Sequence, residues 1–383
     1  MHFKDVVGHI KVKELLINSY QNDRTAHAQI FLGKEGNGAL AMALAYAQYL
    51  LCEQPLAKDS CGNCNACKKG NKQVHPDIHF SYPTVGSKKI STDFITDWRS
   101  MILANPYLSI NQWLERIEAD NKQGNITAGE CLSIVQRLSY KASEGRYRIM
   151  ILWLPEFLGK EGNRLLKLIE EPRPNTIFIL VSEQADKILN TILSRCQLIN
   201  FARLDDDEIA QYLSSQFSLS AEHSQNIAYL SEGNINKAQH LMNEQSNNNS
   251  KLFIEWLRVC YRGQPKAMVD WVEGMITGKH KGKDFFAKTG RKDQVHFLKY
   301  ALFFIREFMT LQQGHDKIRL QDKAFETAHN MLKVLHTDAI IEMMQLFDEM
   351  SFHIERNANP KILFLDASIK MHHIIRKQSI SIA

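Results

Sequence analysis

Four cysteines lie in one short stretch of the chain and are spaced like metal ligands. Eight residues separate the first two and two residues separate each later pair; they are Cys52, Cys61, Cys64 and Cys67. Four thiolates at this spacing suit tetrahedral Zn²⁺, and four cysteine ligands leave no open coordination position. We therefore expect a structural zinc site. The alternative is four free or redox-active thiols.

The segment that carries these cysteines, residues 52–72, contains little apolar material, so metal binding would supply its folding energy. His75 and His79 follow closely and could also be proposed as ligands. Because four cysteines are available, we interpret both histidines as packing or surface residues. The other three cysteines are scattered along the chain, and a disulfide framework is not expected.

A second stretch, residues 31–40, has the outline of a phosphate-binding loop but not its chemical groups. A working loop reads G-x-x-x-x-G-K-[ST]: backbone N–H groups wrap the phosphates, the lysine reaches them and the hydroxyl holds Mg²⁺. Here the glycines are kept, while an alanine and a leucine replace the lysine and the hydroxyl residue; these are Gly33, Gly36, Gly38, Ala39 and Leu40. Lys34 lies at the start of the loop, far in sequence from where the role needs it. The alternatives are a degenerate nucleotide site and a plain strand–turn–helix.

Strands and helices alternate around this loop. Continuous apolar runs predict buried strands, and helical spacing predicts the segments between them. The predicted strands are Gln29–Leu32, Arg146–Leu154, Thr176–Val181 and Gln197–Phe201, and the predicted helices include Ala39–Leu51 and Lys160–Glu171. This alternation is typical of an α/β fold with a parallel sheet.

Residues 83–125 interrupt the alternation and look like an insertion. Apolar spacing predicts one helix over Ser91–Ala104, and a capping box at Ser109 predicts a second helix through Glu118. Another capping box, at Thr127, opens the helix that follows. The insertion could be a partner surface or added core.

After Arg203 the strand pattern ends. Two small helices are expected over 205–217 and 221–243, a polar linker over 243–250, and only helices beyond it. The chain is therefore predicted to be α/β plus all-α, in three parts: a core (1–203), a small helical segment (204–245) and a helical domain (246–383).

The composition is that of an ordinary globular protein, with 44% apolar and 23% charged residues in 383. No apolar run reaches the roughly 18 residues of a membrane span, and the first residues lack a signal stretch, so we expect a cytoplasmic protein without membrane contact. A net charge of +5 permits nucleic-acid contact without demanding it. The densest basic run, Lys279–Lys283, is interpreted as a solvated loop and is not assigned to DNA.

Several segments together resemble the AAA+ clamp-loader subunits of bacterial DNA polymerase III. They are Phe3–His9, His27-Ala28 before the first strand, the glycine loop, the four-cysteine module, Asn163–Pro172 and Ile192–Cys196. The last two are specific: the family reads them as N-x-L-L-K-x-L-E-E-P, with Ile169 a departure here, and as a Ser-Arg-Cys motif. The resemblance is firm over about residues 1–245. It implies an AAA+ P-loop NTPase-like core with an inserted zinc module, a small helical lid and a C-terminal helical collar domain.

Within this family, three parts of the ATP site are missing from the chain. The loop lacks its lysine and hydroxyl, Trp153 and Leu154 stand where the family has Asp-Glu, and Asn236 stands where the family has its lid arginine. The Ser-Arg-Cys motif is kept, and in the family its arginine reaches a neighbouring subunit's ATP. The resemblance thus implies that Arg195 acts in trans, while ATP is not expected to bind productively to this chain. The other reading of Arg195 is a surface salt bridge.

This combination is similar to the delta-prime type of the family, which does not hydrolyse ATP. The resemblance implies partners of the gamma/tau and delta types in a five-subunit ring that loads the sliding clamp onto primer–template DNA. One alternative is an ATP-hydrolysing motor of the gamma/tau type. Another is a zinc-dependent nucleic-acid-binding module outside any loader.

Overall fold

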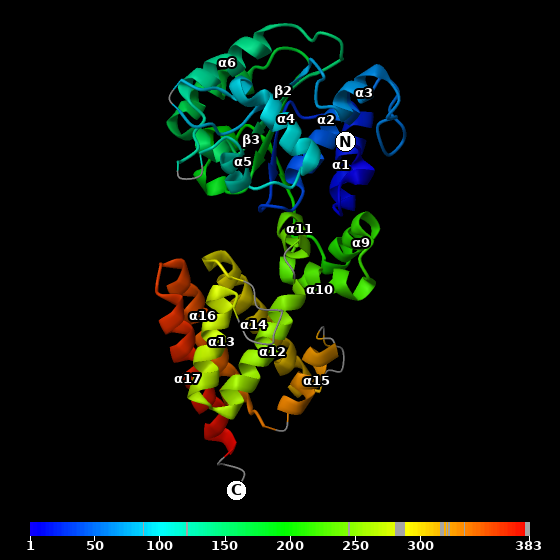
Figure 1. The fold of residues 1–383 in the computed structure, drawn as a ribbon. Coiled ribbons are helices and arrows are strands. Elements are labelled where there is room, and N and C mark those ends of the chain that lie inside the picture. Colours follow the sequence, from blue (N-terminus) through cyan, green and yellow to red (C-terminus); the bar gives the residue numbers. More distant parts are fainter. Residues whose placement is uncertain are drawn as a thin grey trace. The chain divides into compact units, whose positions relative to one another are not determined.

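The structure is a computed structural model, and it describes residues 1–86, 88–119, 122–243, 246–279, 288–314, 318, 320, 322–332 and 334–379. The chain divides into two compact units, Met1–His240 and Leu241–Ala383 (Figure 1). Each unit is described by itself below. None of the described helices is long and apolar enough to cross a membrane.

The first unit is built on a sheet of five parallel strands in the order β2-β3-β4-β1-β5. The strands are β1 (Ala28–Leu32), β2 (Ile78–Ser81), β3 (Arg148–Trp153), β4 (Thr176–Ser182) and β5 (Gln197–Asn200). All residues of β3 and β4 are buried, as is usual for strands covered on both faces. The predicted α/β fold with a parallel sheet is confirmed.

Alternate residues of β1 point to opposite faces of this sheet. On one face, Phe31 stacks on Tyr46 of α2 (Ala39–Leu51), a helix that is buried along its whole length. On the other face, Ile30 belongs to a core formed with α6 (Ala128–Ser139) and the 3-10 helix η3 (Pro155–Leu165). Because α2 is packed this tightly, it fixes the position of the glycine loop that precedes it.

Three sequence predictions about helices are wrong in part. The helix predicted over Lys160–Glu171 is 3-10 up to Leu165, where η3 ends, and α-helical only in α7 (Leu166–Glu170); a kink at Gly159, which has a positive φ, divides η3 just before it. The segment 221–243 is two helices, α10 (Ala221–Ser231) and α11 (Ile235–Asn243), because left-handed residues at 232 and 233 end the first. The linker predicted over 243–250 is helical from Ser246, where α12 begins.

The insertion folds as a 3-10 turn and two helices, η2 (Ser91–Phe94), α4 (Ile95–Ala104) and α5 (Ile110–Arg116). Ser109 forms the predicted capping box with Gln112. Trp98 and Trp113 are fully buried and lie edge to face, with ring centroids 5.3 Å apart. The insertion is therefore anchored by its own aromatic cluster. The remaining helices of this unit are α1 (Ile10–Gln21), α3 (Asn65–Asn71), α8 (Asn190–Leu193) and α9 (Asp206–Phe217).

The described part of the second unit consists of helices. They are α12 (Ser246–Arg262), α13 (Pro265–Thr277), α14 (Arg291–Gln312), α15 (Asp322–Met331), α16 (Thr337–Glu355) and α17 (Pro360–Ser379). At their centre, Trp256 stacks on Trp271 with ring centroids 5.3 Å apart. The all-α prediction for this part of the chain is confirmed. Most of the basic run noted above, from residue 280 onward, lies outside the described residues.

Candidate metal centre and nucleotide site

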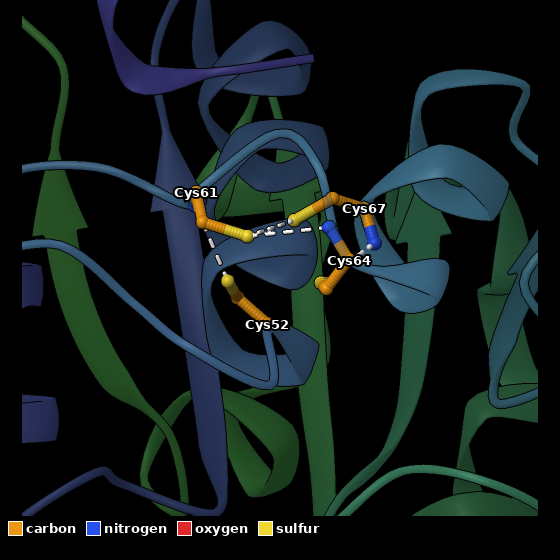
Figure 2. Close-up of side chains that lie close together, drawn as sticks. All are labelled: Cys52, Cys61, Cys64 and Cys67. Atoms are coloured by element: carbon orange, nitrogen blue, oxygen red, sulfur yellow. Dashed lines mark hydrogen bonds between the residues drawn. The ribbon is translucent and has the colours of Figure 1, made fainter.

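The four predicted metal ligands are close together in the structure (Figure 2). Cys52 ends α2, Cys64 caps the N-terminus of α3, and Cys67 lies in its first turn. The Sγ atoms of all four cysteines lie within 4.8 Å of one another, and those of Cys61 and Cys67 are 3.9 Å apart. Zn–S bonds of about 2.3 Å place tetrahedral sulfurs about 3.8 Å apart. The cysteines therefore fit a metal ion that takes four thiolate ligands.

Backbone N–H groups point at three of these sulfurs. Cys61 N donates to Cys52 Sγ at 3.2 Å, and the N–H groups of Cys64 and Cys67 donate to the preceding cysteine sulfur at 3.4 Å each. The N–H groups of Cys64 and Asn63 lower the pKa of Cys61 to about 6, whereas burial raises the pKa of Cys67. Such N–H donors favour thiolates, the form that binds metal. Neither His75 nor His79 is part of this cluster.

The side chain of Asn37 fills the space inside the glycine loop. Asn37 is buried; its Nδ2 donates to Phe201 O at 3.1 Å, and its Oδ1 accepts from Ala39 N at 3.2 Å. A Cβ on Gly33 would lie 1.9 Å from Asn37 Nδ2, so the amide fills the space above that glycine. A donor that a phosphate would need at the start of α2 is thus already used inside the loop.

The loop also lacks a cation where a phosphate would bind. Ala39 and Leu40 are each 5% exposed and carry no polar group. Lys34 is exposed to solvent at the start of the loop. Gly36 and Gly38 keep the left-handed backbone, with φ of 71° and 99°, that gives the loop its outline. The loop therefore has the outline of a phosphate-binding loop and no cation at Ala39 or Leu40.

Three carboxylates gather at the same edge of the sheet. Glu35 follows β1, Glu156 follows β3 and Glu183 follows β4, and these strands are neighbours with their carboxyl ends together. Glu156 Oε1 accepts from Glu183 N at 3.0 Å. Burial raises the pKa of Glu183 to about 7, and Glu35 and Glu156 add to this rise. The edge at which α/β sheets bind ligands therefore carries acidic groups here.

The other two positions of the expected ATP site are occupied by packing and hydrogen bonding. Trp153 is buried at the end of β3, and its ring centroid is 5.1 Å from that of Trp98 in the insertion. Asn236 is buried, and its Oδ1 accepts from Asn105 Nδ2 at 3.0 Å. The sequence did not predict either partner, because both come from the insertion and no local pattern links them to the loop.

Arg195 follows α8 and lies on the surface of the first unit. It forms an ion pair with Glu170 at the end of α7, and both side chains are more than a third exposed. Its Nη1 donates to Thr191 O at 2.7 Å. The neighbouring Cys196 packs against the core. Arg195 is thus held at the surface by groups of its own chain.

This fold and this site define a parallel α/β protein with a cluster of four cysteines and a glycine-rich loop between β1 and α2. The chain belongs to the family described as "DNA polymerase III, delta subunit", whose model matches residues 8–205. The clamp-loader resemblance found in the sequence is therefore confirmed.

Curated relatives carry names from the same system. The chain is 30% identical over 209 residues to DNA polymerase III subunit delta' of Bacillus subtilis, covering 54% of this chain and 51% of that protein. It is 25% identical over 212 residues to subunit delta' of Escherichia coli, covering 55% and 52%. Subunit tau of Bacillus subtilis is 22% identical over 391 residues, covering 96% and 61%. The match spans about half the length of each of these two delta' relatives.

Among solved structures, the chain is similar to a gamma subunit-related protein of Thermotoga maritima, with 12% identity and a TM-score of 0.40 over 94% of this chain and 98% of that one. It is also similar to the Bacillus subtilis clamp loader delta protein, with 9% identity and a TM-score of 0.34 over 94% and 99%.

Proposed function

We propose that the chain is a clamp-loader subunit of the delta-prime type that does not hydrolyse ATP. It would complete a ring with gamma/tau and delta subunits, donate Arg195 to a neighbour's ATP, and help place the sliding clamp on primer–template DNA. In this proposal residues 1–203 are an AAA+ core, 204–245 a lid and 246–383 a collar domain. The delta' names of the relatives support this type of subunit.

The observation that carries the proposal is that the glycine loop has no cation where a phosphate would bind. Asn37 Oδ1 accepts from Ala39 N, Ala39 and Leu40 supply no cation or hydroxyl, and Glu183 adds a carboxyl group at the same edge. A nucleoside triphosphate needs cationic and N–H groups to balance its phosphate charge. A site with an acidic edge and no facing lysine opposes that charge, which supports an inactive ATP site in this chain.

Arg195 is the residue through which this chain would act on a neighbouring subunit. A guanidinium stabilises charge that develops on a transferring phosphoryl group, and an arginine given in trans is worth roughly 10³–10⁵ in rate in some NTPases. Arg195 lies at the surface in an ion pair with Glu170. Because a solvent-exposed ion pair contributes little stability, a neighbour's phosphates could compete for the guanidinium. In the proposal the Glu170 pair holds Arg195 until the ring assembles.

The metal would have a structural role. With four thiolate ligands a bound Zn²⁺ has no open position, so it supplies folding energy and no catalysis. The cysteines would tie the end of α2 to α3 and keep the buried helix behind the loop in place.

A second candidate is an ATP-hydrolysing motor of the gamma/tau type. The similarity to subunit tau of Bacillus subtilis, which covers 96% of this chain, is the observation in favour of this candidate. It requires ATP binding by the isolated chain, and the loop described above provides no group for the γ-phosphate. The third candidate, a zinc-dependent nucleic-acid module, depended on the basic run whose main part lies outside the described residues.

The experiment that tests the proposal is a reconstituted loader with Arg195→Ala in this chain only. We expect single-turnover ATP hydrolysis at the neighbouring site to fall at least tenfold while the ring still assembles. Arg195→Lys keeps the charge without the planar guanidinium and should recover little of the rate. Unchanged hydrolysis with Arg195→Ala in an assembled ring would overturn the role in trans.

A further inference from the structure

The insertion reaches from the core to the small helices α9–α11 of the first unit. Asn105 Nδ2 donates to Asn236 Oδ1 in α11 at 3.0 Å, and Gln112 Nε2 donates to His240 Nε2 at 2.7 Å. The ring of Tyr107 lies 6.3 Å from that of Tyr212 in α9. Three side chains of one short segment, 105–112, thus contact the small helices.

The same segment also contacts the glycine loop and the N-terminal residues. Tyr107 is 4% exposed, and its hydroxyl accepts from Val7 N at 3.1 Å. A Cβ on Gly38 would lie 3.2 Å from Tyr107 Cε1, so this ring packs directly over the start of α2. Burial raises the pKa of Tyr107, which keeps the hydroxyl neutral. Tyr107 therefore lies over the part of the loop that a phosphate would otherwise approach.

The loop and α11 are themselves in direct contact beneath this segment. Ile235 N donates to Gly36 O at 2.9 Å, and Asn234 Nδ2 donates to Glu35 Oε1 at 3.4 Å. A Cβ on Gly36 would lie 1.8 Å from Asn234 Oδ1, so the backbone of the loop touches this side chain. The N-terminal end of α11 thus contacts the loop directly through both backbone and side-chain groups.

The side chains of segment 105–112 are held in place by neighbouring groups of the insertion. Asn105 Oδ1 accepts from Tyr107 N at 2.9 Å, which turns the Nδ2 donor toward Asn236. Helices α4 and α5 on either side are anchored by Trp98 and Trp113, both fully buried. A latch of this kind loses little side-chain freedom on closing, because its base is already rigid.

We propose that the insertion is an internal latch that takes the place of a nucleotide. A ligand that contacts two parts of a protein stabilises the closed arrangement, and here Asn105, Tyr107 and Gln112 make those contacts from within the chain. Because the latch is tethered, it acts at a high effective concentration and needs no free ligand. The small helices would then stay closed at all nucleotide concentrations. The contacts lie within one unit, so the latch stands independently of any role of Arg195 in trans.

The test is hydrogen–deuterium exchange on the full chain without nucleotide, comparing Asn105→Ala/Gln112→Ala with the original. Losing one hydrogen bond of this type raises the opening equilibrium constant by a factor of roughly 2–10. With two bonds removed, we expect the amides of α9–α11 to exchange about ten times faster. Strands β3 and β4 should keep their protection. The matched control is Arg116→Ala, on α5 beside Gln112, whose ion pair with Asp97 stays inside the insertion. It should leave α9–α11 unchanged.

The Asn105→Ala/Gln112→Ala variant could speed exchange throughout the first unit. In that case a double-mutant cycle on Asn105 and Asn236 still tests the proposal. Asn105→Ala and Asn236→Ala remove the two ends of one hydrogen bond, so each alone should speed exchange in α11, and the pair together should do no more than either. Additive effects, or no effect of Asn105→Ala on α11, would overturn the latch. This outcome is separate from the result of the Arg195 test, which reads hydrolysis in an assembled ring.

Discussion

Trp153, the last residue of β3, lies with its ring centroid 5.1 Å from that of Trp98 in the insertion. The clamp-loader resemblance of the sequence leads us to expect Asp-Glu at this strand end. Here the strand end has become part of an aromatic cluster in which Tyr82 also stacks on Trp98 at 4.2 Å. The end of β3 is therefore packed against the insertion and offers no carboxylate at Trp153.

This cluster predicts a large effect of one core substitution. Trp98→Ala should lower the free energy of unfolding by about 3–5 kcal/mol, because a fully buried indole leaves a cavity and its neighbours lose their ring contacts. Urea unfolding followed by circular dichroism measures this. Leu103→Ala, an exposed position on the same helix, is the control and should change the value by about 0.5 kcal/mol or less. Equal effects of the two would contradict the anchoring role of Trp98.

The acidic edge of the sheet predicts a pH effect on stability. The pKa of Glu183 is raised from 4.5 to about 7, so the folded state holds a proton that the unfolded state releases first. Stability should therefore fall as the pH rises from about 4.5 to 7, and the loss should be complete above the folded pKa.

Glu183→Gln removes this titration. At pH 8 the variant should be more stable than the original by about 1–3 kcal/mol, and the difference should disappear near pH 4. Thermal or urea unfolding at several pH values gives the comparison, with Glu171→Gln as the exposed control. A variant that is less stable at pH 8 would show that the carboxylate is stabilised by its surroundings, against our account.

The cysteine cluster predicts one bound zinc ion per chain. Cys64→Ser should lose the metal and unfold at lower denaturant concentration, because the segment between Cys52 and Cys67 is held by the ion. Metal analysis after gel filtration gives the stoichiometry. Cys196→Ala, outside the cluster, should keep one zinc. A chain purified without chelator that holds no zinc, and whose stability a chelator does not change, would contradict this centre.

Arg195 and Glu170 predict a separation between stability and activity. Their ion pair is exposed, so Arg195→Ala and Glu170→Gln should each change the free energy of unfolding by about 1 kcal/mol or less. Denaturant unfolding of the isolated chain checks this. A loss several times larger would mean that Arg195 is a structural residue, and a fall in loader activity could then not be assigned to its chemistry.

Much of the fold could be predicted because it depends on local patterns. The apolar runs placed the four predicted strands within one or two residues, and the cysteine spacing correctly predicted that four cysteines lie close together. The capping box at Thr127 was only half right: Thr127 caps the helix, but the Glu130 carboxylate accepts from Ser91 N at 2.8 Å and pairs with Arg137. A tertiary partner outcompeted the local one.

The closure of the glycine loop could not be predicted, for the same physical reason. Asn37 bonds to Phe201, 164 positions away, and Asn105 bonds to Asn236, 131 positions away. Both are ordinary asparagines in polar loops, and only the folded sheet brings them to their partners. The sequence predicts which ATP-site groups are missing, and the structure shows what the side chains at these positions contact.

The most direct test of the inactive ATP site is a calorimetric titration of MgATP into the isolated full chain. The loop filled by Asn37 and the carboxylates beside it predict no binding heat up to about 1 mM nucleotide, an affinity weaker than about 4 kcal/mol. An intact gamma/tau-type subunit under the same conditions is the positive control. Micromolar binding to this chain would contradict the account and favour the ATP-hydrolysing alternative.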